Sequence, residues 1–116
     1  MTVDIGSVRW EVVVVDDVRA EVRKQDPEES DAMWGCLDER KSKIYIERAE
    51  PRRQAATFFH ECLHAAGLGA DQEDLVLRLE HMLFPALWAQ GWRPFTGEGQ
   101  APRPPKAKKS ARARPR

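Results

Sequence analysis

The sequence contains few cysteines and histidines and no long apolar run. Cysteine occurs only at Cys36 and Cys62, which is too few for a disulfide scaffold or a four-thiolate zinc site. The opening residues, MTVDIGSVRW, lack the basic start and long apolar stretch of a signal peptide, and no segment approaches the roughly 20 apolar residues of a membrane helix. We therefore expect reduced thiols, a cytoplasmic protein and no membrane partner.

Charge is distributed unevenly along the chain. The 116 residues carry 19 Lys or Arg and 19 Asp or Glu, but seven of the basic residues and none of the acidic ones lie in residues 103–116. This stretch, rich in Pro and Ala, cannot bury enough apolar surface to offset its ordering entropy. We expect one folded domain over residues 1–96 and a disordered basic tail over residues 97–116. The tail either contacts nucleic acid or an acidic partner weakly or serves only as a solvated extension.

The middle of the chain predicts a β-hairpin. Met33–Leu37 and Lys43–Glu47 flank the polar turn DERKS. In the second segment, Ile44 and Ile46 alternate with Tyr45 and Glu47, so one face is apolar and the other is polar. This alternation is typical of an exposed edge strand or a half-buried strand.

The other apolar patterns predict one more strand and three helices. Val8–Val15 is rich in β-branched residues and predicts a central strand, and a short helix follows from Val18 to about Lys24. Pro51 and Gly67 suit the start and the end of a longer helix. A last helix, capped by Asp71, should run from Gln72 towards Gln90. We expect an α+β fold in which a small antiparallel or mixed sheet of about three strands packs on these last two helices.

The last helix carries an almost unbroken apolar face, and Pro85 should kink it. The members of this face are Leu75, Val76, Leu79, Met82, Leu83, Ala86 and Leu87.

The motif HECLH lies within the predicted helix from Pro51 to Gly67. Residues four apart on a helix lie one above the other, so His60 and His64 can direct imidazole nitrogens at one point. Zinc accepts nitrogen ligands in this arrangement, and H-E-x-x-H on a helix is typical of metalloproteases. In that motif the intervening Glu61 is the general base. Cys62 lies about 200° from His60 around the helix and should be a packing residue, not a ligand.

Two histidines can also share a helix face without binding a metal. The scarcity of histidine in the chain, the helix signals on both sides and the small residues after His64 favour a metal site. We therefore expect one Zn²⁺.

A catalytic zinc site needs a third protein ligand. Glu73 and Glu80 lie seven residues apart on the last helix and so share a face. The short connection after Gly67 puts Glu73 level with His64, whereas Glu80 lies about 10 Å further along. Glu73 is favoured and Glu80 is the alternate. His81 should lie at the surface.

Three segments resemble the small gluzincin-type zinc peptidases of phages and mobile elements, including the ImmA/IrrE group. They are a glycine-led hairpin ending in KIYIE, the run RRQAATFFHECLHAAG and the downstream EDLVLRLEHMLFPAL. The resemblance implies a zincin-like metallopeptidase domain with ligands His60, His64 and Glu73 and the base Glu61. Such a protease hydrolyses peptide bonds of an intracellular protein with a zinc-activated water, here in a bacterial or phage-infected host cell.

The resemblance also implies a substrate-binding strand before the active helix, which pairs with an extended peptide. Ile44, Tyr45 and Ile46 would then contact the substrate, and the Tyr45 phenol could stabilise an oxyanion. The alternative function is a non-catalytic, metal-stabilised binding module whose basic tail contacts nucleic acid or an acidic partner. The sequence does not indicate an oligomeric state.

Overall fold

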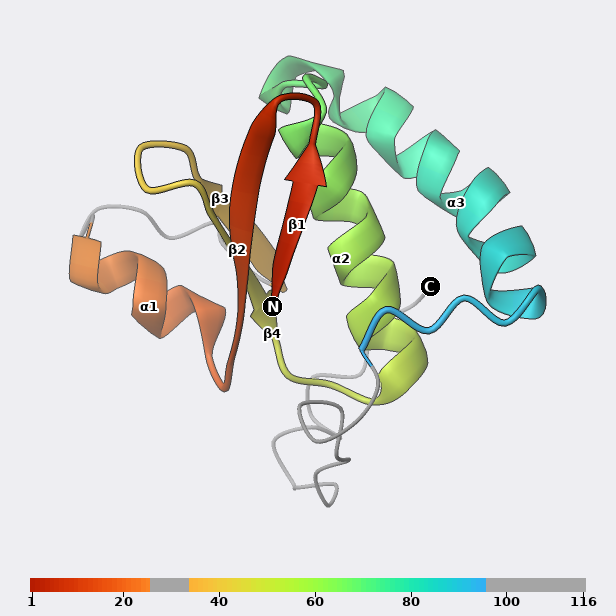
Figure 1. Cartoon of the computed structure of the whole chain (residues 1–116), viewed down its shortest axis with the longest axis horizontal. Coiled ribbons are helices and arrows are strands. Elements are labelled where there is room, and N and C mark those ends of the chain that lie inside the picture. The colour runs from red at the N-terminus through yellow and green to blue at the C-terminus, as the bar shows by residue number, and fades with distance from the viewer. Residues whose placement is uncertain (26–33, 96–116) are drawn as a thin grey trace.

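The computed structural model describes residues 1–25 and 34–95. Met33 of the predicted hairpin and the predicted basic tail lie outside the described residues. The described chain has an α+β fold, as predicted, with a four-stranded mixed sheet and three α-helices (Figure 1).

The sheet has the strand order β1-β2-β4-β3. Its strands are β1 (Thr2–Ile5), β2 (Val8–Val15), β3 (Gly35–Asp38) and β4 (Lys43–Glu47). β2 pairs parallel with β4, and the other two pairs are antiparallel. β1 is not among the predicted strands, because the four residues TVDI form too short a pattern. With β1 added at one edge, β2 and β4 are the two interior strands.

Helices cover both faces of the sheet (Figure 1). α1 (Val18–Gln25) lies on one side, α2 (Pro51–Ala65) lies on the other, and α3 (Glu73–Ala89) packs against α2. A 3₁₀ turn, Ala70–Gln72, leads into α3. The predicted cap at Asp71 is wrong, because α3 begins one residue later and its N-cap Gln72 makes no side-chain cap.

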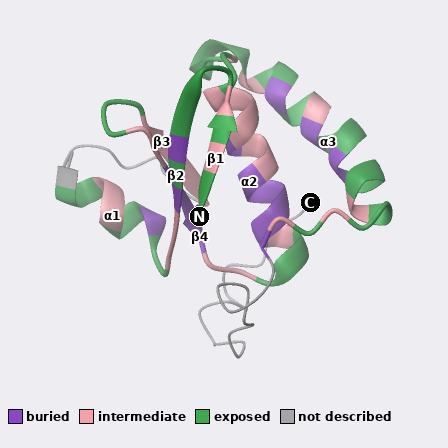
Figure 2. Cartoon of the chain, viewed as in Figure 1, coloured by how far each residue is buried: buried purple, intermediate pink, exposed green. Residues whose placement is uncertain are grey.

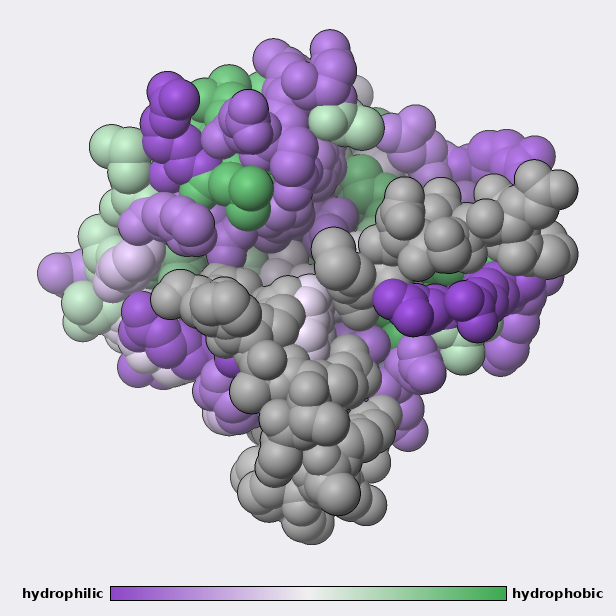
Figure 3. Space-filling view, turned by 180° about the vertical axis from the view of Figure 1, so that it is seen from behind, coloured by the Kyte–Doolittle hydropathy of each residue, from purple (hydrophilic) through white to green (hydrophobic). Residues whose placement is uncertain are grey.

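α3 turns much of its apolar face to solvent. Figure 2 shows exposed residues along most of α3, whereas α2 is largely buried or half-buried. Met82 is 66% exposed and Leu83 is 47% exposed, while the buried residues of α3 are Val76, Glu80 and Phe84. In the view from behind, apolar side chains are visible on the α3 side of the molecule (Figure 3). Much of the predicted apolar face of this helix is therefore exposed to solvent.

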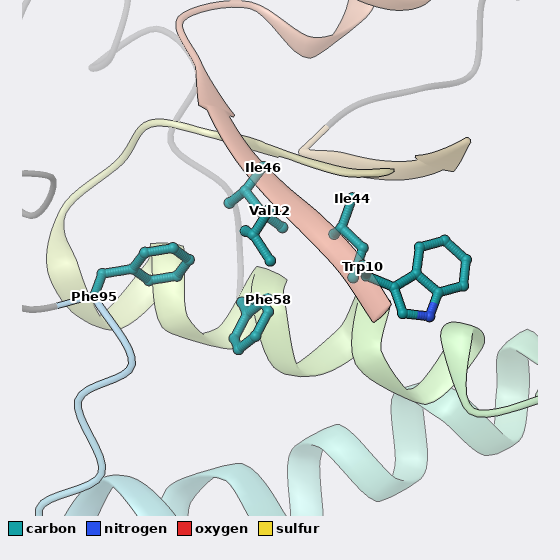
Figure 4. Packing of buried hydrophobic residues seen from close by; sticks show 6 residues of the cluster. All are labelled: Trp10, Val12, Ile44, Ile46, Phe58 and Phe95. Atoms are coloured by element: carbon teal, nitrogen blue, oxygen red, sulfur yellow. The ribbon is translucent and has the colours of Figure 1, made fainter. Parts of the chain in front are cut away.

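The main core lies between the sheet and α2 (Figure 4). Ile44 and Ile46 are fully buried there and pack with Phe58 of α2. Side chains alternate along a strand, so the buried Tyr45 points to the opposite face of the sheet. Both edges of β4 are already paired, with β2 and β3. The prediction that Ile44, Tyr45 and Ile46 bind substrate on an edge strand is therefore wrong.

None of the helices within residues 1–25 and 34–95 combines the length and the apolar character needed to cross a bilayer.

Candidate metal centre

The turn after α2 brings backbone and side-chain groups to the same place. Gly67 has φ 122°, a conformation that favours glycine, and the N–H of Leu68 donates to the carbonyl of Leu63. The reversed chain directs the Leu68 carbonyl at His64, whose Nδ1 lies 2.5 Å away. The following 3₁₀ turn then leads to Glu73 at the start of α3.

His60, His64 and Glu73 form a cluster whose potential ligand atoms all lie within 4.8 Å of one another. His64 Nε2 is 2.8 Å from Glu73 Oε1, and His60 Nε2 is 3.2 Å from Glu73 Oε2. Both imidazoles thus direct the same ring nitrogen at one carboxylate. The predicted set of ligands is brought together and could hold a metal ion.

The other nitrogen of each ring is also occupied. A carbonyl can only accept, so His64 Nδ1 carries a proton and donates to Leu68. His60 Nδ1 is 2.8 Å from Glu80 Oε1, where a carboxylate accepts in the same way. This leaves both Nε2 atoms with lone pairs facing Glu73 unless the rings are protonated. A cation between the two Nε2 atoms and Glu73 removes that repulsion, and hydrogen bonds at the distal nitrogen are typical of metal-binding histidines.

Burial alone would lower the pKa of His60. The hydrogen bond to Glu80 and the negative charges of the neighbouring glutamates outweigh burial, so the pKa of His60 is raised. The centre therefore attracts positive charge, whether a proton or a metal ion.

Glu61 is a residue of α2, and its side chain lies buried against Gly35 at the start of β3. Burial raises the pKa of its carboxyl to about 7; the charges of His60 and His64 oppose this shift. The backbone of Gly35 passes close by. A Cβ atom at position 35 would lie 2.8 Å from Thr57 Cγ2 and 3.0 Å from Glu61 Cγ, so only glycine fits there without displacement. Gly35 thus gives Glu61 its place beside β3.

The two candidate third ligands have different positions. Glu73 lies between the Nε2 atoms, and its side chain is 45% exposed. Glu80 has a 4% exposed side chain and contacts His60 from the opposite, Nδ1 side. The structure therefore groups Glu73 with the two histidines and gives Glu80 a supporting position.

The remaining polar residues of this region lie outside the cluster. Cys62 packs against the core, and burial raises the pKa of its thiol to about 12, so it is no thiolate ligand at neutral pH. His81 is exposed, as predicted.

Three groups that support the histidines or Glu61 were not predicted to do so from the sequence. The Leu68 carbonyl is a backbone group, which no side-chain pattern reveals. The sequence indicates Gly35 only as the first residue of a hairpin. Glu80 is the alternate ligand in the sequence prediction because it shares a helix face with Glu73. The same spacing is the sequence signal for its contact with His60.

No protein-family model matches the chain, and no curated protein or solved structure matches it either. The resemblance to gluzincin peptidases therefore rests on the motifs quoted above and stays a prediction.

Proposed function

We propose that this chain is a zinc-dependent peptidase of the gluzincin type. The observation that carries the proposal is the convergence of two Nε2 atoms and one carboxylate on a single point beside the buried Glu61. His60, His64 and Glu73 would hold the metal. Nitrogen and carboxylate ligands of this number suit a catalytic zinc, which retains an open position. When bound, zinc lowers the pKa of water and polarises a carbonyl group.

Glu61 would move the proton in this reaction. A carboxylate beside the metal can accept a proton from water and later return it. In peptide hydrolysis Glu61 would take a proton from the attacking water, whose oxygen forms a bond to the carbonyl carbon. The same proton would then pass to the leaving amine nitrogen as the C–N bond breaks. Gly35 keeps this carboxylate beside β3 by leaving room for it.

The outer edge of β3 is where a substrate peptide would bind. Within the described residues, β3 pairs only with β4. The N–H of Glu47 donates to the Trp34 carbonyl at 2.8 Å. Hydrogen-bonding direction alternates along an antiparallel pair, so Gly35 and Leu37 turn their backbone groups to the outer edge. A peptide added to that edge would pass Gly35, next to Glu61.

The proposal is tested with the metal content and the activity of two matched variants. We expect one zinc per chain and cleavage of fluorescent casein or of a quenched randomised peptide library. Glu61→Gln should lower cleavage by about 10²- to 10⁴-fold, because the general base is lost, with zinc content unchanged. Glu11→Gln alters an exposed glutamate on β2 and is the control. Unchanged cleavage by Glu61→Gln, or no zinc uptake, would contradict the proposal.

The alternative of a binding module that acts through the basic tail depends on residues outside the described range. It stays a prediction.

A further inference from the structure

Glu80 lies in the middle of the buried line of residues on α3. Val76, Glu80 and Phe84 follow one another at four-residue spacing, so they lie one above the other on the helix, and all three are buried. The neighbours of Glu80 in this line are both apolar. An ionised carboxylate is unfavourable in such a position unless a hydrogen bond compensates for the lost water.

His60 supplies a hydrogen bond to this carboxylate from the other helix. Its Nδ1 lies 2.8 Å from Glu80 Oε1, and the contact joins residues 20 positions apart in the chain. An ionised carboxylate can only accept a hydrogen bond, so the imidazole carries a proton on Nδ1. In the neutral ring the lone pair is then on Nε2, the atom that faces Glu73.

This choice of tautomer requires a partner that only accepts. A glutamine amide at position 80 has nearly the same shape as glutamate, but it can either accept from a protonated Nδ1 or donate to a bare one. When it donates, the proton of the neutral ring is on Nε2 and blocks the atom that would bind a metal. The carboxylate of Glu80 excludes that second arrangement.

His64 has an anchor that does not depend on α3. Its Nδ1 donates to the Leu68 carbonyl, a backbone group in the turn after α2. The two rings are close, with centroids 5.1 Å apart. A change of side chain at position 80 acts directly on His60, whereas His64 keeps its acceptor and serves as an internal reference.

We propose that Glu80 is a positioning residue that fixes His60 in the Nδ1–H tautomer before a metal binds, and that it thereby raises the metal affinity of the centre. This inference rests on the proposed function, in which His60 is a metal ligand, and it adds what prepares that ligand. Glu80 and Glu73 contact different nitrogen atoms of the same ring, so Glu80 acts through His60 and does not replace Glu73.

The tautomer can be measured in metal-free protein. Long-range ¹H–¹⁵N correlation spectra in EDTA at pH 9, well above the usual imidazole pKa of about 6.5, distinguish protonated from bare ring nitrogens. We expect wild-type His60 and His64 to be mainly in the Nδ1–H form. Glu80→Gln should give a mixture of tautomers at His60 and leave His64 unchanged.

Glu11→Gln makes the same chemical change at an exposed position on β2 and should alter neither ring. A mixed or mainly Nε2–H form of His60 in the wild type would overturn the proposal, even if the Glu80 variant failed to fold.

Zinc affinity is the second measurement. Competition with a chromophoric chelator should show about 10- to 100-fold weaker binding by Glu80→Gln, the effect typical of losing the hydrogen-bond partner of a ligand histidine. Unchanged affinity would overturn the proposal. A mixed tautomer and weaker binding, in a protein whose wild type cleaves no peptide, would leave the role of Glu80 standing and remove the peptidase. Wild-type cleavage that depends on Glu61, with an unchanged His60 tautomer in Glu80→Gln, would do the reverse.

Discussion

The two sides of α3 differ in an unexpected way: the side that faces α2 buries acidic residues, and the opposite side exposes apolar residues to solvent. The side facing α2 carries Glu80, 3% exposed, and the half-buried Glu73. The opposite side carries Leu75 and Met82, 37% and 66% exposed. Helical rotation of 100° per residue separates the two acids from these two apolar residues by about 140 to 180°.

This difference indicates what fixes the rotation of α3 about its axis. Burial of apolar area stabilises a fold, and burial of a carboxylate without a partner destabilises it. The side that faces α2 buries the apolar Val76 and Phe84 together with Glu80, so apolar contacts and the carboxylates share one face of the helix. α3 turns both carboxylates towards the histidines of α2. Phe84, on the same side as the acids, packs against Phe59 and supplies part of the apolar contact between the helices.

The largest effect is expected when one residue on each side of α3 is replaced by glutamine. Glu73→Gln should weaken zinc binding by about several hundredfold, because a site of this kind gains roughly 3 to 4 kcal/mol from each ligand. Leu75→Gln, two residues away on the exposed side, should leave the zinc affinity unchanged. Competition with a chromophoric chelator measures both. Equal affinity for all three proteins would mean that α3 is not oriented by a metal.

A buried acid should also have a measurable effect on stability when no metal is bound. The pKa of Glu61 is raised from its usual 4.5 to about 7. The carboxyl loses its proton more readily in the unfolded chain, so wild-type stability falls as the pH rises from 4.5 through 7. Metal-free Glu61→Gln protein should lack this component of the decline and be more stable than wild type by roughly 3 kcal/mol at pH 8. Urea unfolding in EDTA measures the difference, which should vanish near pH 4.5; a constant difference would contradict the assignment.

The smallest effect is expected on the exposed side of α3. Met82→Gln removes an apolar side chain that is 66% exposed, so the free energy of unfolding should change by less than about 0.5 kcal/mol. Thermal or urea unfolding at two protein concentrations measures it. A loss above about 1 kcal/mol, or a loss that depends on concentration, would show that this side of α3 is covered by another surface.

The fold was largely predictable where local patterns determine it. β2, β4, α1 and α2 were expected close to their observed limits, because β-branched runs, Pro51 and Gly67 are local signals. The edge strand β1 and the interior position of β4 depend on pairing between distant segments, which one chain's pattern does not reveal. For the same reason the sequence does not reveal that Ile44 and Ile46, the predicted substrate contacts, belong to the core.

Within the candidate centre, the histidines could be paired from their spacing on one helix, and Glu73 from the shortness of the connection after Gly67. The supporting contacts could not be predicted from the sequence. The Leu68 carbonyl is part of the backbone, and the contact of Glu80 with His60 depends on how α3 is rotated about its axis.

The hydrogen bond from His64 to the Leu68 carbonyl makes the two imidazoles unequally vulnerable to mutation. A single codon change at position 80 can delete the partner of His60, whereas every residue type at position 68 supplies the same carbonyl. Only a change that shifts the main chain, such as a β-branched residue in the left-handed conformation at Gly67, can take that acceptor away. Random mutagenesis should therefore disable the anchoring of His60 through side-chain losses and that of His64 through distortion of the turn.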